Sequence, residues 1–197
     1  MLDLGLTAFL FFTIALFAHA GLSKLNPQNN AFYQDVVRGY ELEESLFGST
    51  LLADLAEQYR PWLVKFIGAA ELFTAILLAV SFTRATGILI ACLLLLIYAL
   101  LFFQQVRYGK ATQDCGCAGP NANLKVDHLL IIRNIVITLL LLAYLTVSPS
   151  LVELNFNYVI TLVGMTLMTI LFYTTFNQWV ANRQIIKAIQ SNQQQPN

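Results

Sequence analysis

Five long apolar runs follow one another along the chain, with polar segments between them. Leucine, isoleucine, alanine and phenylalanine dominate these runs. A helix needs roughly 20 apolar residues to cross the hydrocarbon core of a bilayer, which is about 30 Å thick, so each run is long enough to span a membrane. The predicted spans are 2–22, 62–82, 85–106, 129–147 and 156–180. The pattern therefore predicts an all-α integral membrane protein.

The composition indicates the same class and narrows the range of partners. Of the 197 residues, 57% are hydrophobic and only 11% are charged, a balance that soluble domains do not show. Eleven basic residues balance eleven acidic ones, so no basic surface indicates a nucleic-acid partner. The sequence contains no Gly-rich phosphate loop and no nucleophile elbow, which argues against a nucleotide-driven pump or an ordinary hydrolase. The expected partner is the lipid bilayer.

The first apolar run has a second interpretation as a cleaved secretory signal. Ala18-His-Ala20 has the small-x-small pattern of a cleavage site. A signal begins with basic residues, however, whereas this chain begins with MLDLG, which contains an acidic residue and no lysine or arginine. A retained helix is therefore expected.

The polar segment 23–61 between the first two spans contains two stretches of helical spacing. The first stretch has Phe32, Tyr33, Val36, Val37 and Tyr40, and the second has Phe47, Leu51, Leu52 and Leu55. Each is expected to form a short amphipathic helix at the membrane interface. Because successive spans alternate sides, this segment and the loop 107–128 share one face of the membrane. The segment is then either a lid over that loop or a solvated spacer.

The loop 107–128 carries the most informative motif, QDCGCAGP. A disulfide between Cys115 and Cys117 needs a bent, somewhat strained backbone, which Gly116 permits. Strained disulfides are easily reduced, so the pair predicts reversible thiol–disulfide exchange. Two alternatives remain open. One is a metal site with His128, although the usual second pair of zinc ligands is missing, and the other is a pair of buried structural thiols.

Residues around the pair would influence its reactivity. Gly119 ends the turn together with the proline that follows it, and Asp127 is placed to cap the next helix. The positive end of that helix and two nearby lysines favour a thiolate, while Asp114 opposes it. Cys92 lies about 22 Å of helix away from the loop, at a rise of about 1.5 Å per residue, and is expected to pack in the core.

Ionisable residues inside apolar spans are costly and are therefore candidates for function. Glu71 lies near the middle of the second span and is expected to pair with Lys24 or Arg133. Such a pair either fixes helix packing or takes part in proton transfer or quinone contact. His19 lies close to Lys24 along the first helix, and Asn134 follows Arg133 inside the fourth. Together with Asp114, Gly116 and Gly119 of the loop, these five residues are the supporting candidates for the site.

The charge distribution and the chemistry favour opposite orientations of the loop. The face with the long segment, the cysteine loop and the tail carries Lys24, Arg38, Arg60, Arg107, Lys110, Lys125, Arg183 and Lys187. The opposite face carries only Arg84, so the positive-inside rule would make the cysteine face cytoplasmic. Disulfide exchange in bacteria instead belongs to the periplasm, because the cytosol is reducing. The chemistry is given more weight, and a periplasmic loop in the bacterial inner membrane is expected.

Four features together resemble the methylamine utilisation protein MauE family, which belongs with the DoxX-like membrane proteins. They are HAGLSKL at the end of the first span, the F..V..GY pattern, a glutamate in the second span, and DCGCAG followed by LLIIRN. The resemblance covers about 2–145, and Ala118 replaces a phenylalanine that is usual in the family. It implies a DoxX-like four-helix bundle over 1–148. The rest is expected to be an extra transmembrane helix in 149–180 and a Gln-rich disordered tail in 181–197.

The resemblance also implies a function. MauE-like proteins are associated with production of the disulfide-rich small (beta) subunit of methylamine dehydrogenase, a periplasmic quinoprotein, alongside a thioredoxin-like partner, MauD. The implied role is a membrane accessory for maturation of that subunit, with no required cofactor. Whether the chain is itself an enzyme, a thiol–disulfide oxidoreductase acting with that partner, stays open. The alternatives are a quinone-coupled DoxX-type thiol oxidoreductase with other clients and a non-redox scaffold or metal carrier.

Overall fold

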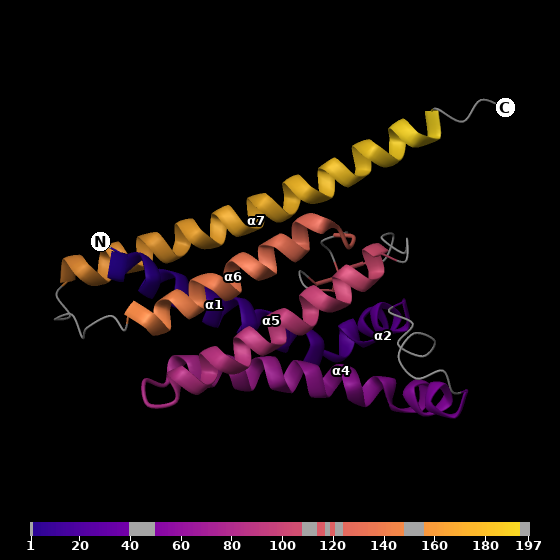
Figure 1. The fold of residues 1–197 in the computed structure, drawn as a ribbon, viewed down its shortest axis with the longest axis horizontal. Coiled ribbons are helices and arrows are strands. Elements are labelled where there is room, and N and C mark those ends of the chain that lie inside the picture. Colours follow the sequence, from indigo (N-terminus) through magenta and orange to yellow (C-terminus); the bar gives the residue numbers. More distant parts are fainter. Residues whose placement is uncertain are drawn as a thin grey trace.

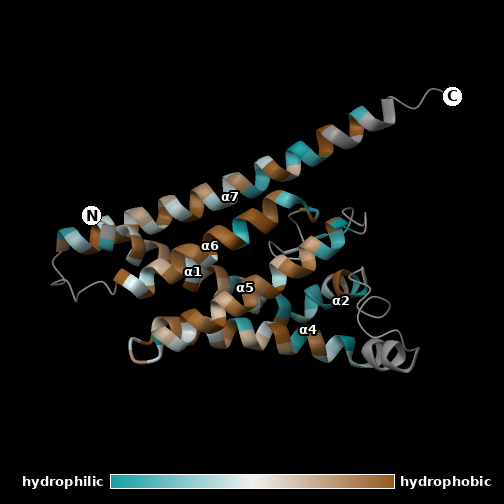
Figure 2. Ribbon diagram, in the orientation of Figure 1, coloured by the Kyte–Doolittle hydropathy of each residue, from teal (hydrophilic) through white to brown (hydrophobic). Residues whose placement is uncertain are grey.

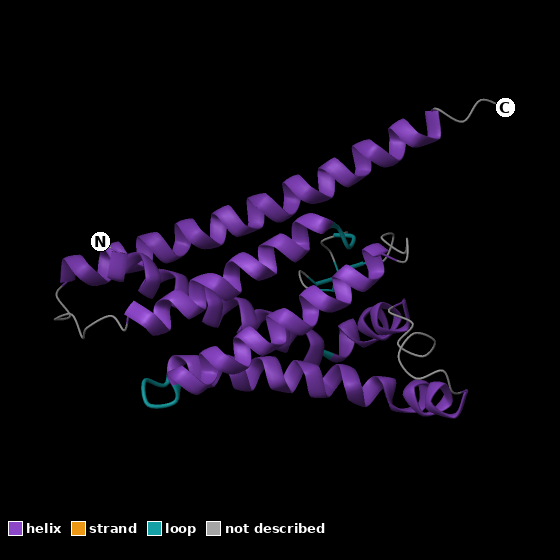
Figure 3. Cartoon of the chain, in the orientation of Figure 1, coloured by secondary structure: helices purple, strands orange, loops and turns teal. Residues whose placement is uncertain are grey.

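The computed structural model describes residues 2–39, 50–107, 114–116, 119–120, 124–147 and 156–193. Its elements are α1 (Leu2–Leu25), the short 3-10 helix η1 (Pro27–Asn29), α2 (Asn30–Gly39), α4 (Thr50–Ala79), α5 (Arg84–Arg107), α6 (His128–Val147) and α7 (Phe156–Gln193). The described part of the chain is helical, without strands, and the long helices run roughly along one direction (Figures 1 and 3).

Five of these helices, α1, α4, α5, α6 and α7, are long and apolar enough to cross a membrane, which confirms the five predicted spans. Large apolar side chains are exposed on their outer faces, including Phe66, Phe73 and Phe172. Figure 2 shows apolar residues along these helices and a more polar α2. A soluble monomer rarely leaves so much apolar surface exposed. The chain is therefore a multi-pass membrane protein.

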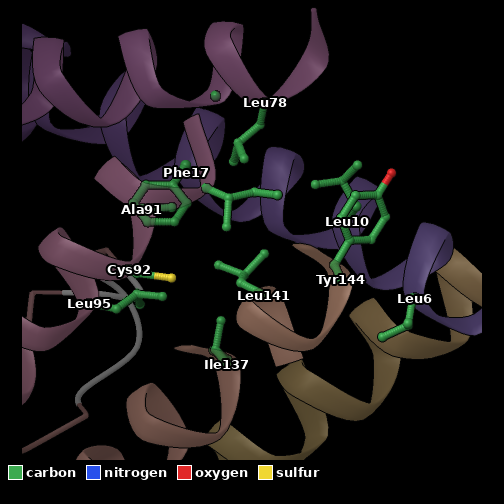
Figure 4. Close-up of a cluster of buried hydrophobic side chains, with 12 residues drawn as sticks. Leu6, Leu10, Phe17, Leu78, Ala91, Cys92, Leu95, Ile137, Leu141 and Tyr144 are labelled. Atoms are coloured by element: carbon green, nitrogen blue, oxygen red, sulfur yellow. The ribbon is translucent and has the colours of Figure 1, made fainter. Parts of the chain in front are cut away.

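The helices pack around a shared apolar core, part of which Figure 4 shows. Helix α1 packs mainly on α4 and also contacts α6 and α7, while α5 packs on α4 and α6. Leu10, Leu78, Ile88 and Leu141 are almost fully buried in this core. Cys92 belongs to the same cluster and is 6% exposed. The prediction that Cys92 packs in the core is confirmed.

Two glycines allow α1 and α4 to approach closely. A Cβ atom added at Gly21 would stand 2.7 Å from the carbonyl oxygen of Gly68 and 2.8 Å from the backbone nitrogen of Leu72. A Cβ atom added at Gly68 would stand 2.9 Å from Cβ of Lys24. Small residues permit such backbone approach between membrane helices. The crossing of these two helices therefore places the last turn of α1 directly against the middle of α4.

The segment between the first two spans is only partly as predicted. Helix α2 confirms the first expected amphipathic helix. In the second stretch, Leu51, Leu52 and Leu55 belong to the first turns of α4, which begins at Thr50 and continues through Pro61, while Phe47 lies outside the described residues. Proline inside a membrane helix is tolerated because neighbouring groups can satisfy the backbone group that it leaves unbonded. Pro61 therefore does not end a separate helix.

The prediction of a disordered tail over 181–197 is wrong for most of that segment. Helix α7 continues to Gln193, so residues 181–193 are helical, and residues 194–197 lie outside the described residues. Arginine, lysine, glutamine and alanine, which are good helix formers, make up much of this stretch. A polar composition alone had suggested disorder, but these residue types also favour continuing a helix that has already formed.

Candidate functional site

The cysteine loop is held by backbone pairing at the end of the bundle where α5 ends and α6 begins. Asp114 and Lys125 form an antiparallel bridge, and the Cys115 N–H donates to the carbonyl of Leu124 at 2.8 Å. The Cys115 side chain is 4% exposed. Gly116 has a φ of 67°, the left-handed conformation that glycine adopts without strain. The predicted bend at this glycine is confirmed, and Cys115 is enclosed within the protein.

Helix α2 covers this loop. A Cβ atom added at Gly116 would stand 3.1 Å from Cγ1 of Val36 and 3.7 Å from the ring of Tyr33, both of which are buried. The Tyr33 hydroxyl donates a hydrogen bond to the Ser23 hydroxyl at 2.8 Å. Ser23 in turn lies beside Gly119, which has a φ of 86°. The segment was interpreted either as a lid over the loop or as a solvated spacer, and α2 has the position of a lid. The hydrogen bond to Ser23 attaches this lid to the end of α1.

A polar cluster lies inside the bundle around Glu71. Lys24 Nζ donates to both carboxylate oxygens of Glu71, at 2.8 and 2.7 Å. The Tyr98 hydroxyl donates to Glu71 Oε1 at 2.5 Å. Glu71 is 1% exposed, so its charge is neutralised by one cation and stabilised by three hydrogen bonds. The predicted pairing of Glu71 with a basic residue is confirmed, and Lys24 is the partner.

A second polar cluster joins α6 to α7. Arg133 Nη1 donates to Asn177 Oδ1 at 2.9 Å, and its guanidinium lies 5.3 Å from the centre of the Tyr173 ring. Arg133 Nη2 lies 3.4 Å from Oδ1 of Asn134. The Asn134 side chain is also buried, and its Nδ2 has no hydrogen-bond partner among the described residues. The amide donor of Asn134 is therefore unused within the described part of the chain.

Helix α7 also holds the second half of the cysteine loop. Gln184 accepts a hydrogen bond from the Lys125 N–H at 3.1 Å and donates to the Lys125 carbonyl at 2.9 Å. Lys125 belongs to the strand-like pairing that positions Cys115. Val180 and Ala181 of α7 pack in the same buried cluster as Cys115. The fifth span therefore contributes directly to positioning the loop.

Replacing Gln184 by alanine is expected to speed hydrogen exchange of the Lys125 amide roughly fivefold, because the variant loses a hydrogen bond worth about 1 kcal/mol. Exchange would be measured by mass spectrometry on the full chain. Gln178→Ala, an exposed position on the same helix, is the matched control and should leave exchange unchanged. Equal exchange in both variants would contradict a positioning role for Gln184.

Both polar clusters and the cysteine loop line one internal cavity of about 120 Å³. All six α-helices of the described part of the chain contribute to its lining, and most of that lining is apolar. The charged and amide side chains of the lining are Lys24, Glu71, Arg133 and Asn134, and three tyrosines, Tyr33, Tyr98 and Tyr173, also line it. Cys115 and Gly116 also line the cavity. The arrangement can hold a small, largely apolar molecule next to the Cys115 side chain.

The structure brings together some of the predicted site residues and separates others. Lys24, Glu71, Arg133 and Asn134 share the cavity with Cys115. His19 is exposed and is not among the residues that line the cavity, so the structure does not bring it together with the other predicted site residues. His19 and Lys24 are five positions apart, which on an α-helix is a rotation of roughly 140°, so their side chains face different directions.

Two further points concern the cysteine motif itself. Cys117 lies outside the described residues. Among the described residues, no group of three or more His, Cys, Asp or Glu side chains is arranged to hold a metal ion.

At the start of α6, Asp127 Oδ1 accepts a hydrogen bond from the His128 N–H at 2.6 Å, which confirms the predicted cap.

Several functional residues were missed by the sequence interpretation. Tyr98 donates to Glu71, and Asn177 and Gln184 attach α7 to the site. The sequence did contain a signal for Asn177 and Gln184. They are seven positions apart, so they lie on one face of a helix, and each is a polar residue within or next to an apolar run. Tyr98 sits among leucines and phenylalanines, and its sequence context carries no comparable signal.

The comparisons with known proteins agree on one family. A family model described as methylamine utilisation protein MauE matches residues 1–147. The methylamine utilization protein MauE of Paracoccus denitrificans is 32% identical over 145 residues, which cover 74% of this chain and 70% of that protein. No solved structure matches the chain. The matched region ends with α6, so Asn177 and Gln184 lie beyond it. The chain, with its five helices able to cross a membrane, belongs to the methylamine utilisation protein MauE family.

Proposed function

We propose that the chain is a membrane accessory of methylamine utilisation that exchanges disulfides through Cys115 and Cys117 during maturation of the methylamine dehydrogenase small subunit. The observation that carries the proposal is the setting of Cys115. Backbone pairing with Leu124 fixes its position, α2 covers it, and it lines an internal cavity. Membership of the MauE family supports the pathway, and the small subunit is proposed as the client.

In the proposed reaction, the oxidised Cys115–Cys117 pair accepts electrons from a thioredoxin-like partner. A thiolate of the partner attacks the pair, a mixed disulfide forms, and the partner's second thiolate resolves it. The partner leaves as a disulfide and the pair is left as two thiols, so two electrons and two protons have moved. The partner's disulfide is then passed to the client by the same exchange chemistry. The chain is thus the membrane end of a relay that oxidises the client.

The burial of Cys115 sets a condition for this exchange. Because Val36 and Tyr33 pack against Gly116, a protein thiol can reach Cys115 only after α2 moves away from the loop. Helix α2 packs on α4 and touches α1, and it is short enough for such movement to cost few contacts. The covered state protects Cys115 from unrelated thiols until a partner binds at α2.

The proposal includes an orientation in which α2 and the cysteine loop face the periplasm. The excess of Lys and Arg on this face favours the cytoplasm. That rule is statistical, whereas a reducing cytosol would keep an exchangeable pair as thiols with no oxidised partner to meet. The chemistry of the pair therefore outweighs the charge count.

Cys115→Ser and Cys117→Ser are each expected to abolish disulfide formation in the small subunit, because neither variant can close or open the bridge. The readout is the oxidation state of the client, followed by thiol trapping and gel shift in cells. Cys92→Ala, which changes a thiol in the apolar core, is the matched control and should mature the client normally. A client that is fully oxidised in the double serine variant would overturn the proposal.

The same trapping in a Cys92→Ala background also tests the orientation. A membrane-impermeant maleimide, applied to spheroplasts after mild reduction, should label the pair. Labelling that appears only after lysis would place the loop in the cytoplasm. Because Cys115 is covered by α2, labelling is expected to be slow there, and the reaction should be followed over time.

A further inference from the structure

We propose that the buried guanidinium of Arg133 stabilises the thiolate that Cys115 becomes during disulfide exchange. The exchange itself rests on the proposed function, whereas the place and the charge of Arg133 are features of the structure. Three observations carry the inference. Arg133 is held about one helical turn from the buried cluster that contains Cys115, both residues line the same cavity, and the charged side chains of that lining are positive overall.

The place of Arg133 follows from the packing of α6 and α7. Leu130 of α6 and Val180 of α7 belong to the same buried cluster as Cys115. Arg133 comes three residues after Leu130. Asn177 comes three residues before Val180 and accepts a hydrogen bond from Arg133 Nη1 at 2.9 Å. Residues three apart share a helix face and differ by about 4.5 Å of rise, so this hydrogen bond fixes the guanidinium about one turn from the cluster.

The charges of the cavity lining do not cancel. The charged residues of the lining are Lys24, Glu71 and Arg133. Lys24 and Glu71 form a direct ion pair at 2.7 Å, so their charges largely offset each other, and Arg133 adds a positive charge. The oxygens of Asn177 and Asn134 that accept from Arg133 belong to neutral amides, so these hydrogen bonds hold the guanidinium without cancelling its charge. The cavity therefore favours a negatively charged group.

The other groups around Cys115 leave this positive charge in place. Each helix contributes one titratable group to the lining, and these are Lys24, Tyr33, Glu71, Tyr98, Arg133 and Tyr173. The tyrosines are neutral side chains. Next to Cys115, Asp114 is paired with Lys125 across the antiparallel bridge, and opposite charges that face each other on paired strands compensate each other. Because most of the lining is apolar, the charge of Arg133 is screened less than it would be in water.

Exchange produces a thiolate at Cys115 whichever sulfur of the bridge the partner attacks. If the partner attacks Cys117, the sulfur of Cys115 leaves in the first step with the electron pair of the broken S–S bond. If the partner attacks Cys115, that sulfur leaves in the second step, when the partner's other thiolate resolves the mixed disulfide. Each step forms one S–S bond and breaks one, so one thiolate enters and one leaves. A leaving thiolate departs faster when a neighbouring cation stabilises it.

The test measures how fast Cys115 reacts with iodoacetamide at different pH values. The full chain in lipid nanodiscs would carry Cys92→Ala and Cys117→Ser, which leaves Cys115 as the one thiol. Mass spectrometry would follow alkylation. Arg133→Gln removes the charge but can still donate to Asn177. It is expected to raise the midpoint of the rate–pH curve by about one pH unit and to slow the reaction at neutral pH about five- to tenfold. Above the midpoint, the rate should be at least that of the parent.

A second variant covers the case in which Arg133→Gln does not fold. Asn177→Asp is nearly isosteric and puts a carboxylate where the amide oxygen now accepts from Arg133 at 2.9 Å. This carboxylate offsets the charge of the guanidinium, so the midpoint should again rise. Arg133→Lys keeps a positive charge and should keep the midpoint close to that of the parent.

Arg84→Gln is the matched control. Arg84 lies at the other end of α5 from the cysteine loop and donates to the Tyr144 hydroxyl at 3.1 Å, so its loss should leave the midpoint unchanged. An equal midpoint in the parent, Arg133→Gln and Asn177→Asp would overturn the inference. An Arg133→Lys midpoint as high as that of Arg133→Gln would also overturn it, because the charge would then not be the cause.

The Cys115→Ser/Cys117→Ser double variant separates the inference from the proposed function. If the midpoint does not move and the client stays reduced in the double variant, the role of Arg133 is wrong and the exchange function stands. If the midpoint moves and the double variant matures the client normally, the effect of Arg133 on the thiolate stands and the exchange function is wrong.

Discussion

Lys24→Met is expected to destabilise the protein by about 3–5 kcal/mol, because it leaves the charge of Glu71 buried without a cation. Glu71 is 1% exposed, and Lys24 Nζ contacts both of its carboxylate oxygens. Of the hydrogen bonds to Glu71 among the described residues, only the one from the Tyr98 hydroxyl would remain. Methionine has a length similar to that of lysine and an equally apolar stem, so the loss of stability would come from the missing positive charge. Unfolding in mixed detergent micelles would measure it.

Glu71→Gln provides the comparison for that result. The amide oxygen of glutamine can still accept from Lys24, and the Lys24 side chain keeps 12% of its surface accessible, so its charge is less completely buried. The expected loss is about 1–2 kcal/mol. The Lys24→Met/Glu71→Gln double variant should be more stable than Lys24→Met alone, because no buried charge remains. A Lys24→Met variant as stable as Glu71→Gln would contradict the buried ion pair.

Gly21→Ala is the second change with a large expected effect, about 2–3 kcal/mol of destabilisation. The added Cβ would lie 2.7 Å from the Gly68 carbonyl oxygen and 2.8 Å from the Leu72 nitrogen. Both are backbone atoms, so the overlap cannot be relieved by turning a side chain. Helices α1 and α4 must then separate, which also lengthens the contact between Lys24 and Glu71. The free energy of unfolding in mixed micelles would measure the effect.

Gly164→Ala is the matched control for this substitution. Gly164 also lies in a membrane helix, but a Cβ atom added there would have no neighbour within 4 Å. Alanine is a better helix former than glycine by about 0.8–1 kcal/mol, so this variant should be as stable as the parent or more so. If Gly21→Ala behaves in the same way, the close crossing of α1 and α4 is wrong.

Features that depend on local patterns of residues could be predicted from the sequence. Five apolar runs of sufficient length predicted the five spans, since a bilayer imposes the same length requirement on each helix separately. The helical spacing around Tyr33 and Val36 predicted α2. The cost of a charge inside an apolar span predicted that Glu71 has a basic partner. The position of Cys92 within such a span predicted core packing.

Which residues contact one another became clear only from the packing of the helices. The sequence left Lys24 and Arg133 as equal partners for Glu71, and the close approach at Gly21 and Gly68 selects Lys24. His19, five positions before Lys24 on α1, does not line the cavity. Asn177 and Gln184 reach the site from a helix whose end had been expected to be disordered. Such contacts join residues far apart in the chain, and they follow from how whole helices pack, which no local pattern of residues encodes.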